Sequence, residues 1–127
     1  MEKALRSIIH DIAIGKILIQ TNEKSGEPTL HYIKLPKNIN EFQVILCDAT
    51  LGTGAASMMA IRVLIEFGVL EQHIVFVCLI GAPQGVSNIM RCYPKVRIVC
   101  SMVDKGLNER FHILPGIGNF GRSYFGC

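Results

Sequence analysis

D-A-T-L-G-T-G-A-A-S, from Asp48 to Ser57, follows the apolar run 44–47 and precedes a helical pattern that begins near Ala55. This order of strand, small-residue loop and helix is typical of an α/β protein that binds a phosphate. The loop N–H groups converge on the anion, and the helix N-terminus adds a favourable dipole. The acidic residue can accept hydrogen bonds from sugar hydroxyls or approach a metal ion, which favours a ribose phosphate over a bare phosphate. Taken alone, the loop is equally compatible with a turn in which Thr caps the helix and Gly bends the chain.

Apolar runs and helical patterns alternate after this loop and predict a parallel sheet flanked by helices. In such sheets ligands bind beyond the carboxyl ends of the strands. Asp48, Gly81 and Asp104 each follow an expected strand, so we expect all three at one edge. The expected strands are 43–47, 74–80 and 96–103, and the expected helices are 55–67 and 86–92, with a turn over 81–85.

The first 36 residues predict a helix and a hairpin arm. Residues 3–12 have helical spacing, with Leu5, Ile8, Ile9 and Ile12 on one face. Strands are expected over 16–20 and 30–35, joined by a turn over 22–28 and ended by Pro36.

The composition fits one domain over residues 1–127, with 50% apolar and 18% charged residues. The net charge of +3 is small and scattered, so no nucleic-acid partner is expected. No apolar stretch reaches about 18 residues, so no membrane span is expected. The five cysteines are odd in number and form no C-x-x-C, which indicates reduced thiols, no metal site and an intracellular location, cytoplasmic or nuclear. No P-loop motif occurs, so this chain is not itself a P-loop kinase.

The tail from Leu114 to Gly126 is glycine-rich and is interpreted as a loop with tight backbone geometry. Its P-G-x-G-N-x-G run exposes backbone N–H and C=O groups, which can specify a flat nucleobase. The alternative is a glycine-rich turn that seals a core. The segment 104–109 is either a solvated turn or part of the substrate side, and His112 is interpreted as an ordinary half-buried histidine rather than a general base.

Together these motifs resemble the uracil phosphoribosyltransferase family, and most closely the C-terminal domain of uridine-cytidine kinase-like proteins. Four blocks match in order, and the likeness covers essentially the whole chain. They are the loop 48–57, G-A-P-Q-G at 81–85, D-K-G-L-N-E at 104–109, and the tail 114–126. The family continues before the equivalent of Met1, so the resemblance implies a truncated domain whose uncovered apolar surface favours association. A homo-oligomer is therefore compatible with the sequence.

The resemblance implies a type I-like phosphoribosyltransferase fold, with a hairpin arm and a C-terminal base-binding hood. The implied reaction converts uracil and 5-phosphoribosyl 1-diphosphate into UMP and diphosphate in pyrimidine salvage, with Mg²⁺ bound through the diphosphate. The implied phosphoribosyl positions are Asp48, Ala49, Thr50, Leu51, Gly52, Thr53, Gly54, Ala55, Ala56, Ser57 and Asn119, and the implied uracil positions are Ile113, Gly118, Asn119 and Phe120.

Four of the departures from the family pattern change a charged or hydrogen-bonding side chain. Ala56 replaces a Ser, which Ser57 compensates one place later, and Asn119 and Arg122 replace two Asp residues. Thr21 stands where the family has an Arg that binds the diphosphate. The residues implied to bind the 5-phosphate are thus largely retained, whereas those implied to bind the departing diphosphate are lost. Loss of one electrostatic contact to the diphosphate costs on the order of 10²–10³-fold in rate. The alternative function is therefore a catalytically weak or inactive domain that senses a nucleotide or mediates dimerisation beside a separate kinase domain.

Overall fold

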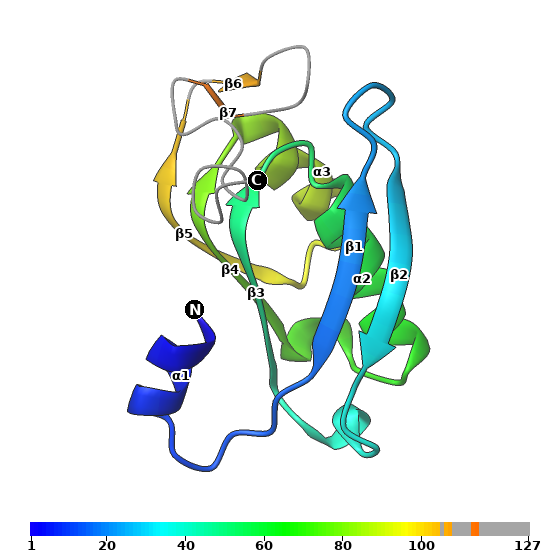
Figure 1. Cartoon of the computed structure of the whole chain (residues 1–127), viewed down its shortest axis with the longest axis vertical. Coiled ribbons are helices and arrows are strands. Elements are labelled where there is room, and N and C mark those ends of the chain that lie inside the picture. The colour runs from blue at the N-terminus through cyan, green and yellow to red at the C-terminus, as the bar shows by residue number, and fades with distance from the viewer. Residues whose placement is uncertain (105, 108–112, 115–127) are drawn as a thin grey trace.

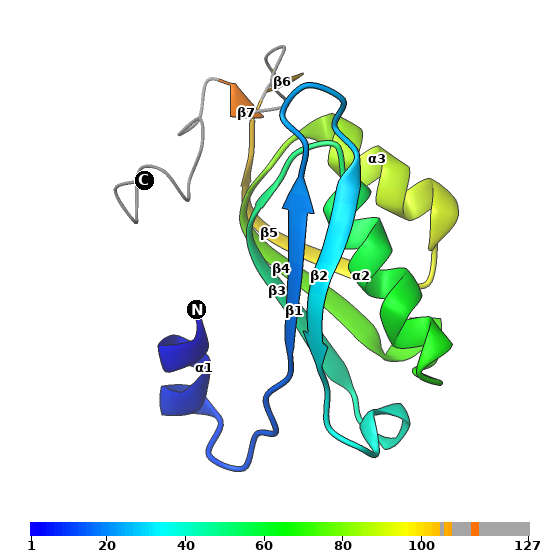
Figure 2. The same cartoon turned by 45° about the vertical axis from the view of Figure 1, so that its right-hand side comes forward.

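A parallel sheet and two helices form the centre of the molecule. The computed structural model describes residues 1–104, 106–107 and 113–114. Its three-stranded parallel sheet has the order β3-β4-β5, and α2 and α3 cover one face (Figures 1 and 2). The bounds are β3 Val44–Leu51, α2 Ala55–Glu66, β4 Ile74–Gly81, α3 Pro83–Cys92 and β5 Arg97–Val103. The predicted α/β class with parallel strands is confirmed.

The core lies between the sheet and the two helices. β4 is the central strand, and the side chains of Ile74, Phe76 and Cys78 on its helix-facing side are at most 1% exposed. α2 contributes Ile61 and Leu64, and α3 contributes Ile89. Because strand side chains alternate between faces, one row of apolar residues on β4 suffices to anchor both helices.

The opposite face of the sheet carries apolar side chains that remain accessible. Ile45, Leu79 and Val99 are exposed by 41%, 42% and 54% and alternate with the residues that face the helices. Among the described residues, no helix is both long and apolar enough to cross a bilayer.

The N-terminal region forms α1 (Glu2–Ile8) and an antiparallel hairpin of β1 (Lys16–Thr21) and β2 (Pro28–Lys34). The hairpin packs along α2, and β1 runs in the same direction as the central strands (Figure 1). The hairpin arm is therefore confirmed. The helix predicted over 3–12 is too long, and α1 buries none of its residues because it lacks a packing partner among the described elements.

Several predicted boundaries are wrong for identifiable reasons. β3 continues to Leu51, since its ladder with β4 extends to the pair Leu51–Gly81. Pro83 starts α3 rather than lying in a turn, because proline is well suited to the first helical position. Beyond the sheet, β6 (Gly106–Leu107) pairs with β7 (Ile113–Leu114), so Leu114 is not loop and part of the segment 104–109 is strand. Two short 3-10 turns, Ile39–Glu41 and Glu71–His73, complete the described elements.

Candidate functional site

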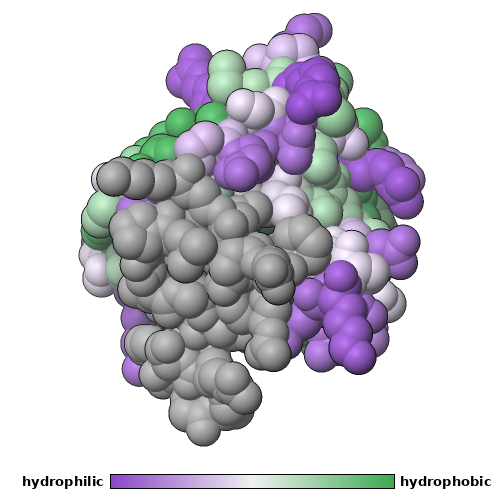
Figure 3. Space-filling model, turned by 90° about the horizontal axis from the view of Figure 1, so that it is seen from above, coloured by the Kyte–Doolittle hydropathy of each residue, from purple (hydrophilic) through white to green (hydrophobic). Residues whose placement is uncertain are grey.

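Backbone hydrogen bonds link the carboxyl ends of the three parallel strands at one edge of the sheet. The Ala82 N–H donates to the Leu51 carbonyl at 2.8 Å, and the Asp104 N–H donates to the Gly81 carbonyl at 2.7 Å. Figure 3 views the molecule onto this end, where hydrophilic residues lie beside weakly apolar ones in the described part. The prediction that Asp48 also lies at the end is wrong, because Asp48 pairs with Cys78 inside the ladder, three residues before Leu51. Its carboxylate therefore lies lower on the sheet than Gly81 and Asp104.

The loop between β3 and α2 leaves several backbone donors available. Gly54, with φ of +88°, is the N-cap of α2, and its carbonyl accepts from the Met58 N–H at 2.7 Å. The Ala55 N–H is partly satisfied by the Thr53 hydroxyl at 3.3 Å. Five other N–H groups of this segment donate no hydrogen bond within the described part of the chain. They belong to Gly52, Thr53, Gly54, Ala56 and Ser57. Unsatisfied N–H groups at a helix N-terminus suit an anion.

Helix α3 packs closely against this loop. A Cβ on Gly85 would overlap the Gly52 carbonyl oxygen and lie 2.8 Å from Leu51 Cγ, so only glycine fits there. One turn later, Asn88 Nδ2 donates to the Thr53 carbonyl at 2.8 Å. Neither contact is predictable from the sequence. The G-A-P-Q-G block marked Gly85, but no local pattern indicates which loop its backbone touches.

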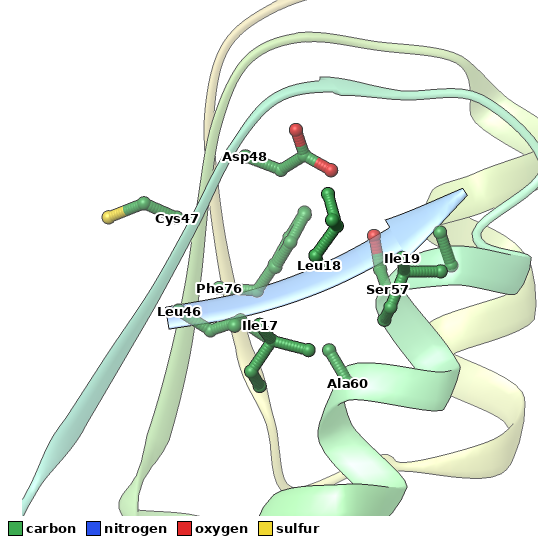
Figure 4. A pocket seen from close by; sticks show the side chains of 10 residues that line it. Ile17, Leu18, Ile19, Leu46, Cys47, Asp48, Ser57, Ala60 and Phe76 are labelled. Carbon is green, nitrogen blue, oxygen red and sulfur yellow. The ribbon is translucent and has the colours of Figure 1, made fainter. Parts of the chain in front are cut away.

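A pocket of about 190 Å³ lies between the hairpin and the sheet (Figure 4). Ligand pockets usually exceed ~300 Å³, so this one has room for only part of a nucleotide-sized ligand. The carboxylate of Asp48 lies beside Leu18 at its upper rim, and the Ser57 hydroxyl faces the same space, whereas the Cys47 side chain points away. The lining residues are Ile17, Leu18, Ile19, Leu46, Cys47, Asp48, Ala56, Ser57, Ala60 and Phe76.

Asp48 has a perturbed titration. Its loss of hydration among apolar neighbours raises the pKa of the carboxyl group, and hydrogen bonds from the backbone N–H groups of Ala49 and Thr50 oppose this rise. The Ala49 N–H lies 2.7 Å from Asp48 Oδ1. The residue retains solvent access on its open side, so a polar ligand can reach the carboxylate.

The structure brings together part of the predicted phosphoribosyl set. Asp48, Ala56 and Ser57 share the pocket, the segment 52–54 forms the adjoining loop, and Ala55 begins α2. Ala49 and Thr50 lie in β3, and the Leu51 side chain belongs to the core with 1% exposure. Ile113 belongs to β7, while the predictions at 118–120 and at Arg122 lie outside the described residues.

No group of three or more potential metal-binding side chains occurs in residues 1–104, 106–107 and 113–114. This part of the chain therefore offers no protein cage for Mg²⁺. Asp104 Oδ2 is buried and has no hydrogen-bond partner among the described residues.

The thiol of Cys78, in the central strand β4, is a poor nucleophile. Burial, and then a hydrogen bond with Cys100, raises the pKa of the Cys78 thiol to about 12, so this thiol stays protonated at neutral pH. Cys78 is also part of the core at 1% exposure, and it is a free cysteine.

A parallel sheet flanked by helices, with unsatisfied loop N–H groups and a carboxylate beside them, defines the chain as an α/β protein. The family model for uracil phosphoribosyltransferase matches residues 1–127. The chain belongs to the uracil phosphoribosyltransferase family.

The similar proteins are of two kinds, uridine-cytidine kinase-like proteins and uracil phosphoribosyltransferases. The proteins of both kinds are longer than this chain. The chain is 52% identical over 126 residues to mouse uridine-cytidine kinase-like 1, covering 99% of itself and 23% of that protein. It is 42% identical over 126 residues to uracil phosphoribosyltransferase 1 of Schizosaccharomyces pombe, covering 99% of itself and 58% of that protein. Among solved structures, protein AQ2163 of Aquifex aeolicus matches with a TM-score of 0.84 and 27% identity, over 95% of this chain and 57% of that one. The resemblance to this family and its type I-like fold are thus confirmed.

Proposed function

We propose that this chain acts in pyrimidine salvage by joining uracil to the phosphoribosyl group of 5-phosphoribosyl 1-diphosphate, giving UMP and diphosphate. The observation that carries the proposal is that the N–H groups at 52–54, 56 and 57, which have no acceptor among the described residues, lie beside the pocket that holds the carboxylate of Asp48. Family membership and the similarity to the fission yeast uracil phosphoribosyltransferase support the choice of substrates.

The two parts of the site suit the two polar parts of a ribose phosphate. The loop N–H groups and the N-terminus of α2 favour the 5-phosphate, because both present partial positive charge. Asp48 accepts hydrogen bonds from the ribose hydroxyls, and its open side leaves room for them. By the family resemblance, Ile113, Gly118, Asn119 and Phe120 hold the uracil, mainly through backbone groups. Fixing the base beside the anomeric carbon accelerates the reaction by removing the entropy cost of bringing the reactants together.

In this proposal Mg²⁺ binds together with the diphosphate group of the substrate. Magnesium keeps several waters and is commonly held by substrate phosphates with one or two carboxylates, so it does not require a protein cage. When bound, the ion neutralises charge on the departing diphosphate. In this proposal the ion is held by the substrate phosphates and by water.

A second candidate function is nucleotide sensing or dimerisation beside a kinase domain. It is favoured by the 52% identity to a uridine-cytidine kinase-like protein, of which this chain spans 23%. It is also favoured by Thr21, the exposed last residue of β1, which brings no positive charge to the position of the family's diphosphate-binding Arg. In this alternative the site binds UMP or a related nucleotide without turnover.

Pyrophosphate release from uracil and 5-phosphoribosyl 1-diphosphate with Mg²⁺ separates the two candidates. We expect slow release that requires uracil, and we expect Thr21→Arg to raise the rate on the order of 10²-fold by restoring a cation at the leaving group. Thr29→Arg is the matched control, since it adds the same charge on the neighbouring strand β2. The absence of release together with retained UMP binding would favour the sensor, and the absence of both would exclude both candidates.

A further inference from the structure

We infer that Asn88 is a positioning residue for the phosphate loop, and that it sets the direction in which the Gly54 N–H points. This inference rests on the proposed phosphate role of the loop. Asn88 lies on α3, 35 residues along the chain from Thr53, and its half-buried amide donates to the Thr53 carbonyl at 2.8 Å. The contact is thus a tertiary bond between a helix and the loop.

The bond fixes the orientation of one peptide unit. In a planar trans peptide the C=O and N–H groups point in opposite directions. Because the Thr53 carbonyl faces α3, the Gly54 N–H of the same unit faces away from α3. The Ser57 N–H has no intrahelical acceptor in any case, because the carbonyl of the N-cap Gly54 makes the first helical bond, with the Met58 N–H. The Asn88 bond therefore sets the direction of one loop donor, the Gly54 N–H.

Arg91 fixes the orientation of the Asn88 amide itself. Its Nη2 donates to Asn88 Oδ1 at 2.9 Å, so the Nδ2 group is the one that faces Thr53. An asparagine amide can otherwise rotate by half a turn and present an oxygen. With an oxygen in that place, the Thr53 carbonyl would meet an acceptor and turn away. The close approach of Gly85 to Gly52 and Gly54 provides the second support that holds the loop against α3.

An NMR titration of the full chain with ribose 5-phosphate tests the inference. In the wild type we expect a large shift of the Gly54 amide resonance on saturation. In Asn88→Ala we expect the affinity to fall about five- to tenfold, the usual value of one neutral hydrogen bond, with a smaller Gly54 shift. Asn88→Asp should be weaker still, because its carboxylate faces a carbonyl oxygen. Ser87→Ala is the matched control on an exposed position of the same helix, and it should bind as the wild type does.

The readouts separate positioning from general stability. Equal ribose 5-phosphate affinity and an equal Gly54 shift in Asn88→Ala and the wild type would overturn the inference. If Asn88→Ala does not fold, Arg91→Ala replaces it, since Arg91 is exposed and its loss frees the amide to rotate; a two- to threefold loss of affinity is expected, and no loss overturns the inference. A wild type that binds ribose 5-phosphate no better than ribose would instead refute the phosphate role of the loop, and with it the positioning role.

Discussion

Gly85→Ala is expected to disorganise the phosphate loop and destabilise the fold. The new Cβ would overlap the Gly52 carbonyl oxygen and press on Leu51, which is a core residue at 1% exposure. Overpacking of this kind costs about 1–3 kcal/mol, and the shift of the loop should weaken ligand binding by on the order of 10²-fold. Thermal unfolding and calorimetric titration with UMP measure the two effects.

The matched control for this prediction is Gln84→Ala, which changes the preceding, exposed residue of α3. An alanine within a helix is normally more favourable than glycine by about 1 kcal/mol. Gly85→Ala should therefore be stabilising if the close approach is unimportant. A thermal midpoint equal to or above that of the wild type would contradict the packing described between α3 and the loop.

Asp48→Asn is expected to weaken the binding of UMP by roughly 10- to 100-fold. Hydrogen bonds to a charged group contribute about 1.5–3 kcal/mol, and the amide keeps the shape of the side chain but not its charge. Calorimetric titration with UMP measures the change. Asp11→Asn is the matched control at an exposed carboxylate outside the site, and a similar loss in both variants would contradict a specific role of Asp48.

The same substitution should raise stability at neutral pH. Since the pKa of Asp48 is raised from its ordinary value of 3.8, the folded protein holds the carboxyl proton more tightly than the unfolded chain does. The free energy of unfolding then falls as the pH rises from that value through the raised pKa, and the cost persists at higher pH. Asp48→Asn removes this contribution, so its stability relative to the wild type should increase between pH 4 and pH 7. A constant difference over that range would contradict the raised pKa.

The sequence predicted those parts of the fold that depend on local patterns. Continuous apolar runs identified β4 and β5, and the spacing of strands and helices was sufficient for parallel pairing. The local patterns predicted the wrong boundaries where tertiary contacts determine the ends of a strand or helix. The residues from Asp48 to Leu51 look like loop because the continuous apolar run stops at Cys47, but pairing with β4 holds them in a strand. Helix α1 is shorter than its apolar spacing predicts, because spacing stabilises a helix only where a partner covers that face.

The candidate site also has parts that the sequence predicts and parts that it does not. The loop and its Asp could be found from the sequence because their chemistry lies within ten consecutive residues. The pocket could not, because Ile17, Leu18 and Ile19 reach it from a hairpin with no chemical signature. The contact of Asn88 with Thr53 could not be found from the sequence either, because an Asn in a helix of mixed composition resembles any surface residue.

The central claim is that the segment 48–57 holds a ribose phosphate, and a comparison of UMP with uridine tests it most directly. The two ligands differ only in the phosphate, which is the group that the loop N–H groups are proposed to bind. Calorimetric titration of the full chain should give an affinity for UMP at least on the order of 10²-fold above that for uridine, in keeping with several charge-assisted hydrogen bonds. Equal affinities for UMP and uridine would contradict the account.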